Sequence, residues 1–241
     1  MLTAGIKQRI NSTYAEYNDG TVELEVRFGR LTNRGFAPGV TRQVFNRIRD
    51  YFNNRAQVVE TKTTDYISQN VRKTVTVPVG DESPQTIWIT KDRLWNQEDK
   101  NYGMRYSMSR EVPIQPVPEF VPEIIREKNR YSYSVFRDMV RIDITMVDMV
   151  QGLQGGRHND ETRFEVEVEL VNPLGLDSFD KALIVTLQRV LDTIVLYNNN
   201  EANSVINFVN TLLGSRKRGI MDHYPLVQAR NLKLKDMVWG G

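Results

Sequence analysis

Strict alternation of apolar and polar residues marks several stretches in the middle of the chain. Residues 21–30, 140–149 and 162–171 place an apolar side chain at nearly every second position, with mostly charged or polar side chains between. Successive side chains of a β-strand point to opposite faces, so this period predicts strands with one apolar and one charged face. Such strands, spread along the chain, indicate a protein built mainly from antiparallel β-structure.

Further strands are expected between these three. Runs rich in β-branched and aromatic residues, separated by turn signals such as Gly80-Asp81, predict strands at 71–77, 86–91, 105–112 and 126–135. Residues 35–39 are expected to form a turn, and the proline-rich residues 112–122 a loop or an edge segment.

Helical periodicity appears at both ends of the chain and once inside it. Thr41 precedes residues 42–53, whose apolar side chains recur on one helical face, so a capped amphipathic helix is expected there. A short N-terminal helix is expected over residues 2–17. The pattern predicts an α+β fold, mainly antiparallel β, in a single domain over 1–241. Its β core spans about 21–171, and its covering helices span about 42–53, 178–197 and 201–213, followed by a C-terminal segment over 215–241.

The composition narrows the chemistry that this chain can carry out. Its 241 residues are 40% hydrophobic and 26% charged, enough to bury a sizeable core. Lys and Arg total 32 against 30 Asp and Glu, so any charge-based function must come from local segregation of charge. The chain has no cysteine, which excludes disulfides, zinc ribbons and thiol catalysis. It has two histidines, which argues against metal sites built from several histidines. The chemistry of an enzyme with this composition would therefore rest on carboxylates, Lys and Arg, with or without a bound metal.

No stretch of the sequence resembles a signal peptide or a membrane span. The N-terminal residues lack an apolar core, and the longest apolar candidate, residues 139–149, is interrupted by Arg141, Asp143 and Asp148. We therefore expect an intracellular protein without a membrane partner.

The charged faces of the alternating strands are unusual for strands at a protein surface. One strand carries Glu165, Glu167 and Glu169 on a single face, and another carries Glu23 and Glu25. One such glutamate pair would usually face solvent. Neighbours on one face lie about 6.5–7 Å apart, and like charges at that range raise one another's pKa unless a cation intervenes. Since cationic faces of matching length occur over residues 128–132 and 140–146, the faces are expected to meet.

A sheet closed with these polar faces inward would be a barrel with a charged lumen. Clustered carboxylates make a hard oxygen site for Mg²⁺ or Mn²⁺, and clustered Lys and Arg bind phosphate. Together they suit metal-assisted transfer of a phosphoryl group to water. The apolar faces would point outward, where helices must cover them. The lumen would contain Glu23, Glu25, Glu165, Glu167 and Glu169 together with Arg27, Arg72, Lys128, Arg130 and Arg141.

These residues resemble the triphosphate tunnel metalloenzymes, and among them the metal-dependent RNA triphosphatases of fungal and DNA-virus mRNA capping, including the giant-virus (mimivirus-type) members. The family's first motif, Glu-x-Glu-x-Arg-x-Gly, matches residues 23–29, and its last, Glu-x-Glu-x-Glu, matches residues 165–169. Between them, Lys-x-Arg matches residues 128–130 and Arg-x-Asp-x-Thr matches residues 141–145. Any one of these motifs alone is weak, but all four occur in the family's order and spacing.

The resemblance implies an eight-stranded antiparallel tunnel and a specific reaction. The expected enzyme removes the γ-phosphate from 5′-triphosphate RNA, leaving a 5′-diphosphate end for a guanylyltransferase, and has a side activity on free NTPs. A guanylyltransferase domain is expected as a linked or associated partner, with the segment at 215–241 leading to it. If the chain is viral, the expected location is the host cytoplasm, in a virus factory, or the virion.

The resemblance also implies roles for single residues. Glu23, Glu25 and Glu169 are expected to bind Mg²⁺ or Mn²⁺. Glu165 and Glu167 are expected to order metal-bound and attacking water, which Glu111 would position. The expected phosphate-binding residues are Arg27, Arg72, Lys91, Lys128, Arg130 and Arg141, and the expected orienting residues are Asp143 and Thr145.

Two other functions are compatible with the same residues. The tunnel could process another triphosphate, such as tripolyphosphate, thiamine triphosphate or ATP, although those relatives more often carry Lys where this chain has Arg27. It could instead be a non-catalytic barrel that binds polyphosphate or RNA. Five clustered glutamates argue against the second alternative, since binding anions gives no reason to gather carboxylates.

Overall fold

The computed structural model describes residues 2–17, 19–77, 83–136, 138–151, 159–171 and 176–198. The helix expected at 201–213 and the segment at 215–241 lie outside these residues. The helices are α1 (Ala4–Glu16), α2 (Arg42–Asn53) and α3 (Leu176–Asn198). The strands are β1 (Val22–Thr32), β2 (Gly35–Pro38), β3 (Val58–Ser68), β4 (Val71–Val77), β5 (Gln85–Asp99), β6 (Met104–Pro113), β7 (Ile124–Val135), β8 (Val140–Gln151) and β9 (Asn159–Leu170).

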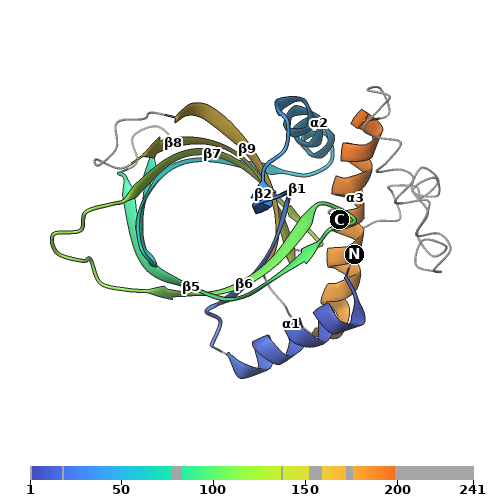
Figure 1. Ribbon diagram of the computed structural model, residues 1–241, viewed down its shortest axis with the longest axis horizontal. Coiled ribbons are helices and arrows are strands. Elements are labelled where there is room, and N and C mark those ends of the chain that lie inside the picture. Colours follow the sequence, from blue (N-terminus) through green and yellow to red (C-terminus); the bar gives the residue numbers. More distant parts are fainter. Residues whose placement is uncertain are drawn as a thin grey trace.

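Eight of these strands close into an antiparallel barrel, as expected from the sequence. Neighbours follow the order β1-β6-β5-β4-β3-β7-β8-β9, and β1 pairs again with β9 to complete the ring, which Figure 1 views along its axis. In the closing pair, Glu25 lies opposite Glu169 and Arg27 opposite Glu167. Since residues that pair across antiparallel strands share a face, this register brings the first and last motifs together inside the barrel.

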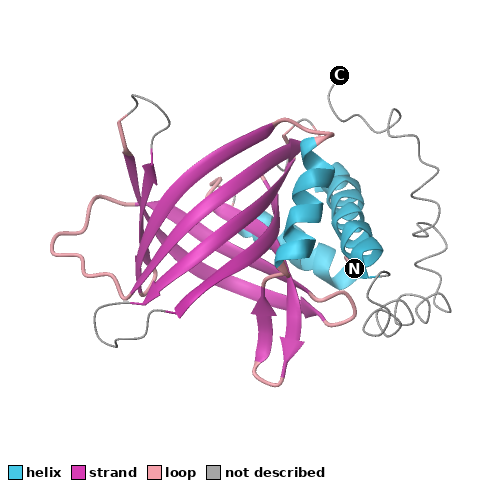
Figure 2. Ribbon diagram, turned by 90° about the horizontal axis from the view of Figure 1, so that it is seen from above, coloured by secondary structure: helices cyan, strands magenta, loops and turns pink. Residues whose placement is uncertain are grey.

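The apolar face of each alternating strand points outward and forms the hydrophobic core. Leu24, Val26, Ile142, Ile144 and Val168 are fully buried although they lie on the outside of the ring. Helices cover this face along one side of the barrel, as Figure 2 shows. The protein is therefore inverted relative to a barrel with an apolar interior: its core lies between strands and helices, and its polar residues lie within the ring.

Helix α2 supplies much of this cover. The Thr41 hydroxyl accepts a hydrogen bond from the Val44 backbone N–H at 3.2 Å, which caps the helix start as predicted. Below the cap, the predicted apolar face is buried, and the Phe45 ring packs against Phe164 with the ring centres 5.1 Å apart. Phe52 packs likewise against Tyr133, at 5.7 Å.

Two details differ from the sequence expectation. Residues 35–39 were expected to form a turn, but Gly35–Pro38 pair with Gly29–Thr32 as strand β2. The reason lies at Gly29, where a Cβ would come within 2.2 Å of the Ala37 carbonyl oxygen, so glycine permits this close approach. Strand β5 also runs past the expected 86–91 to Asp99, with an irregularity in the pairing between Arg93 and Trp95.

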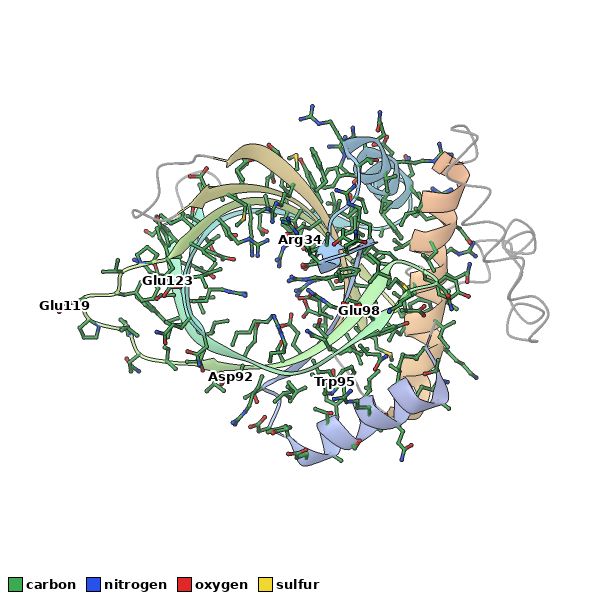
Figure 3. All side chains as sticks on the ribbon, viewed as in Figure 1. Arg34, Asp92, Trp95, Glu98, Glu119 and Glu123 are labelled. Atoms are coloured by element: carbon green, nitrogen blue, oxygen red, sulfur yellow. The ribbon has the colours of Figure 1, made fainter. Side chains whose placement is uncertain are left out.

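A third helix, α1, adds cover that the sequence had not assigned to it. Ile6 and Ile10 belong to the buried cluster, and the Trp95 indole N–H donates to the Thr13 hydroxyl at 2.9 Å. The guanidinium of Arg9 lies 4.7 Å from the centre of the same indole ring. Figure 3 shows Trp95 on the α1 side of the ring, away from its centre.

We predict that Phe45→Ala lowers the free energy of unfolding by about 3–5 kcal/mol, because it leaves a cavity between α2 and the barrel. Urea denaturation followed by far-UV circular dichroism measures the change. Gln43→Ala, an exposed position on the same helix, is the control and should change the stability by less than about 0.5 kcal/mol. Equal effects for the two variants would mean that α2 does not seal the apolar face.

Candidate active site

The polar faces of the strands enclose a cavity of about 390 Å³ inside the barrel. Figure 3 shows side chains from strands around the ring projecting toward its centre. The charged residues that line the cavity are Glu23, Glu25, Arg27, Arg72, Lys91, Glu111, Arg126, Lys128, Arg130, Arg141, Glu167 and Glu169. The structure thus brings together every site residue predicted from the sequence except Glu165, Asp143 and Thr145, which are buried beside it.

Carboxylates gather on β1 and β9, with cations inserted between them. Glu23 and Glu25 point inward from one strand, and Glu169 lies opposite Glu25 on the next. The Lys91 ammonium lies 2.6 Å from Glu23 and 2.6 Å from Glu111, so it bridges two carboxylates. Arg141 donates a hydrogen bond to Glu169. The acidic residues of the cavity are therefore paired with basic side chains from β5 and β8.

These cations neutralise the carboxylates unequally. Burial and the nearby Glu23 charge raise the pKa of Glu169 to about 9. Burial and the charge of Glu167 raise the pKa of Glu25 to about 7. For Glu23, burial favours the neutral form, but Lys91 outweighs it and lowers the pKa to about 2. The carboxyl groups at this end of the cavity are thus too close together and too buried for all of them to be ionised at neutral pH.

Such a carboxylate set fits Mg²⁺ or Mn²⁺ in its chemistry, because both ions prefer oxygen ligands and would stabilise the ionised forms of Glu25 and Glu169. Across the described ranges, no group of three or more acidic or histidine side chains is arranged to hold a metal ion. Lys91 and Arg141 contact Glu23 and Glu169 instead. A metal bound here would therefore require these two cations to move from the carboxylates.

The neighbouring wall, on β7 and β8, is cationic and is organised by buried aspartates. Asp143, only 1% exposed, accepts from the Ser132 hydroxyl at 2.7 Å and from Arg141 Nε at 3.0 Å. Arg130 lies 3.2 Å from the same carboxylate. This single buried carboxylate thereby fixes two arginines side by side, in the position where the resemblance implies an orienting group.

Two aspects of the site were not anticipated from the sequence. Asp65 on β3 forms an ion pair with Lys128 and accepts a hydrogen bond from Thr74 at 2.8 Å. Arg126 Nη2 donates to both oxygens of Glu165, at 2.9 and 2.7 Å. Arg126 could have been recognised, because it has the same strand parity as Lys128 and Arg130. Nothing in the sequence around Asp65 marked it as part of the site.

Thr145 and Glu165 do not contact the cavity in the way their predicted roles would suggest. The Thr145 hydroxyl is buried and makes no hydrogen bond within the described part of the chain. Glu165 is engaged by Arg126, so its carboxylate is turned to the β7 wall. The roles implied for both residues stay predictions.

The chain is similar to known proteins in both sequence and fold. A family model described as "mRNA capping enzyme, beta chain" matches residues 31–203, a stretch that begins after the Glu23–Gly29 motif. A comparison with curated proteins found no significant match. Among the described residues, no helix is long and apolar enough to cross a membrane.

Two solved structures share the fold. The Pct1 RNA triphosphatase of S. pombe is 19% identical, with a TM-score of 0.54, over 80% of this chain and 90% of that one. The triphosphatase of the Mimivirus capping enzyme is 15% identical, with a TM-score of 0.55, over 78% of this chain and 98% of that one.

Binding of polyphosphate in the cavity is predicted to weaken as the pH rises through about 8. Burial, together with Arg126 and Arg130, lowers the pKa of Lys128 to about 8 despite the attraction of Asp65. Below that pH the ammonium is charged and can bind phosphate, and above it the amine is neutral. Calorimetric titration of tripolyphosphate in EDTA, from pH 7 to 9.5, measures the affinity.

The matched variant for this prediction is Lys128→Arg, whose guanidinium stays charged throughout this range. Its affinity should change less with pH than that of the wild-type protein. If both proteins show the same pH profile, Lys128 is not the group that titrates.

Proposed function

The chain belongs to the family of mRNA capping enzyme beta chains, and we propose that it is a metal-dependent RNA 5′-triphosphatase. In this proposal it removes the γ-phosphate of 5′-triphosphate RNA, the first step of capping, and also acts on free NTPs. The observation that carries the proposal is the lumen itself, where a carboxylate-rich wall on β1 and β9 adjoins a cation-rich wall on β7 and β8. A triphosphate needs cations along its length, and its hydrolysis needs a site for a metal and a water.

The cationic wall would bind and orient the phosphates. Lys128, Arg130 and Arg141 line the cavity from adjacent strands, and Asp65 and Asp143 hold their charged ends in place. Since these side chains are already fixed by ion pairs, little conformational entropy is lost when the substrate binds. Arg72 and Lys91 line the opposite side, so the triphosphate would lie between two sets of cations.

Glu23, Glu25 and Glu169 would hold Mg²⁺ or Mn²⁺. When bound, such an ion would neutralise charge that develops on the γ-phosphoryl oxygens. The basic side chains contribute in the same direction. Lys91 and Arg141, once displaced from the carboxylates, would be available to the phosphate oxygens. When metal and substrate bind, the ion pairs within the lumen would thus be replaced by contacts of the carboxylates with the metal and of the cations with the phosphates.

The attacking water is assigned to Glu111 more readily than to Glu167. The pKa of Glu111 is raised by burial and by the charge of Glu23, which makes its carboxylate a better proton acceptor near neutral pH. In Glu167, burial is outweighed by Arg27 and other cations, which lower the pKa to about 2. Glu167 lies 2.8 Å from Arg27 Nε. We therefore propose that Glu111 holds the water and that Glu167 fixes Arg27.

The partner expected after this step is a guanylyltransferase, which consumes a 5′-diphosphate RNA end. One structural relative is described as the RNA triphosphatase domain of a trifunctional mimivirus mRNA capping enzyme. By analogy, we propose that the present chain is one domain of such an enzyme or associates with the next enzyme, in an intracellular setting.

The proposed reaction is tested with RNA labelled in its γ-phosphate, incubated with Mg²⁺, with Mn²⁺ or with EDTA. Metal-dependent release of labelled phosphate is expected. Glu23→Gln and Glu111→Gln should each reduce the rate by about 100-fold or more, because each removes a group that acts in the transition state. Glu127→Gln, an exposed position on β7, is the matched control and should keep the wild-type rate.

The substrate is settled by running tripolyphosphate and GTP beside the RNA. Release from tripolyphosphate without release from RNA would retain the tunnel chemistry but replace the proposed substrate. If neither substrate releases phosphate with either metal, the proposed function is wrong and a binding role would take its place.

A second prediction separates an enzyme from a binding module. In EDTA at pH 7, Glu23→Gln should bind tripolyphosphate several-fold more tightly than the wild-type protein, because one negative charge is removed and Lys91 is freed. The same variant should have lost hydrolysis in the presence of metal. Isothermal calorimetry and the phosphate-release assay measure the two effects. Tighter binding with unchanged hydrolysis would remove Glu23 from the metal site.

A further inference from the structure

A second cavity, of about 210 Å³, lies next to the first inside the barrel. The first cavity is bordered by the start of β1 and the end of β9. The second is bordered by the first half of β6, at Arg105 and Ser107, and by the β3–β4 turn at Gln69 and Asn70. The first cavity therefore lies nearer the end of the barrel where β1 begins, and the second lies nearer the end that carries the β3–β4 turn.

The second cavity carries a large excess of positive charge. Among its described lining residues, Glu25 is the one carboxylate. The cations are Arg27, Arg72, Lys91, Arg93, Arg105 and Arg126. The hydroxyl groups of Ser107 and Ser109 add hydrogen-bond donors to the same wall. The cavity is therefore suited to bind an anion.

Part of this positive charge is neutralised by carboxylates that line the first cavity or are buried beside it. Arg27 pairs with Glu167, Lys91 with Glu23 and Glu111, and Arg126 with Glu165. Arg105 is different because it forms no ion pair with a carboxylate in the described part of the chain, and its buried Nε has no hydrogen-bond acceptor there. Burial and the positive charges of Arg27 and Arg93 lower the pKa of Arg105 despite the attraction of Glu25 and Glu98.

The guanidinium of Arg105 is positioned by the β1–β2 hairpin. Phe36 of β2 packs with its ring centre 4.9 Å from the Arg105 guanidinium carbon. Arg93 lies across from Ser109, next to the irregularity in the β5–β6 pairing. A stacked guanidinium with an unpaired donor, and a second arginine that lines the same cavity, supply the charged hydrogen-bond donors that a phosphate group needs.

We propose that this second cavity is a separate phosphate-binding site built on Arg93 and Arg105. Its ligand is a phosphate group beyond the one being cleaved, either the released orthophosphate or a phosphodiester of the RNA chain. The site itself follows from the geometry, and only the identity of the molecule that carries the phosphate rests on the proposed function.

The site is tested first by direct binding, without catalysis. Inorganic phosphate is titrated in EDTA into ¹⁵N-labelled protein, and the arginine Nε–H resonances are followed, with assignment from single variants. Arg105 is expected to shift with saturation, and Arg105→Gln should weaken that binding about tenfold, as for loss of a charge-assisted hydrogen bond. Arg47→Gln, an exposed arginine on α2, is the charge-matched control. Sodium chloride at equal ionic strength should not reproduce the shift.

The source of the phosphate is distinguished by comparing ligands. Affinities of Arg105→Gln and Arg93→Gln are measured in EDTA for a 5′-triphosphate oligonucleotide, for GTP and for orthophosphate. If the site holds the RNA chain, the variants lose affinity for the oligonucleotide but not for GTP. If it holds the released product, they lose affinity for orthophosphate and bind the oligonucleotide and GTP like the control.

The proposal is overturned if both variants bind all three ligands like Arg47→Gln, or if the Arg105 resonance responds to chloride as it does to phosphate. None of these measurements requires hydrolysis. If phosphate binds at Arg105 but the protein does not cleave RNA, the second site stands and only the proposed function is wrong. Cleavage of RNA without phosphate binding at Arg105 would leave the proposed function standing and overturn the second site.

Discussion

Neutralisation of charge inside a closed barrel is the constraint on which the rest of this structure depends. Carboxylates of β1 and β9 lie side by side in the lumen, as Glu25 and Glu169 do, and both their mutual repulsion and their burial oppose ionisation. Basic side chains from other strands lie between them, as Lys91 does between Glu23 and Glu111. Because these pairs join strands far apart in the sequence, the ring must close before the charges can be satisfied.

The inward polar faces dictate where the hydrophobic core can be. The outward faces carry residues such as Leu24, Val26 and Ile142, which must be covered to be buried. Helices α1, α2 and α3 provide that cover, so the helices and the charged lumen are consequences of the same alternation. A change in the packing of α2 is therefore expected to affect stability first and the lumen only indirectly.

The cations on β7 and β8 are paired with buried aspartates, whereas the carboxylates on β1 and β9 contact cations that a metal would have to displace. Asp143 fixes Arg130 and Arg141 from behind, and Asp65 does the same for Lys128. The carboxylates at the other wall have raised pKa values and are contacted by cations that could exchange partners. This division supports the proposed hydrolysis. Arg105 stands outside it, because this arginine forms no ion pair with a carboxylate in the described part of the chain.

The sequence by itself determined the strands, their inward faces and most residues of the lumen, because a period of two assigns each side chain to a face without knowledge of its neighbours. It also determined the capped helix at 42–53 from Thr41 and its apolar spacing. It could not reveal Asp65, β2 or the second cavity. Each of these depends on strand register and on contacts between distant segments: Asp65 matters because β3 lies beside β7, and β2 forms because Gly29 admits a close approach. Each of the two cavities in the lumen is lined by residues from several strands far apart in the sequence, so only the tertiary structure decides which side chains share one.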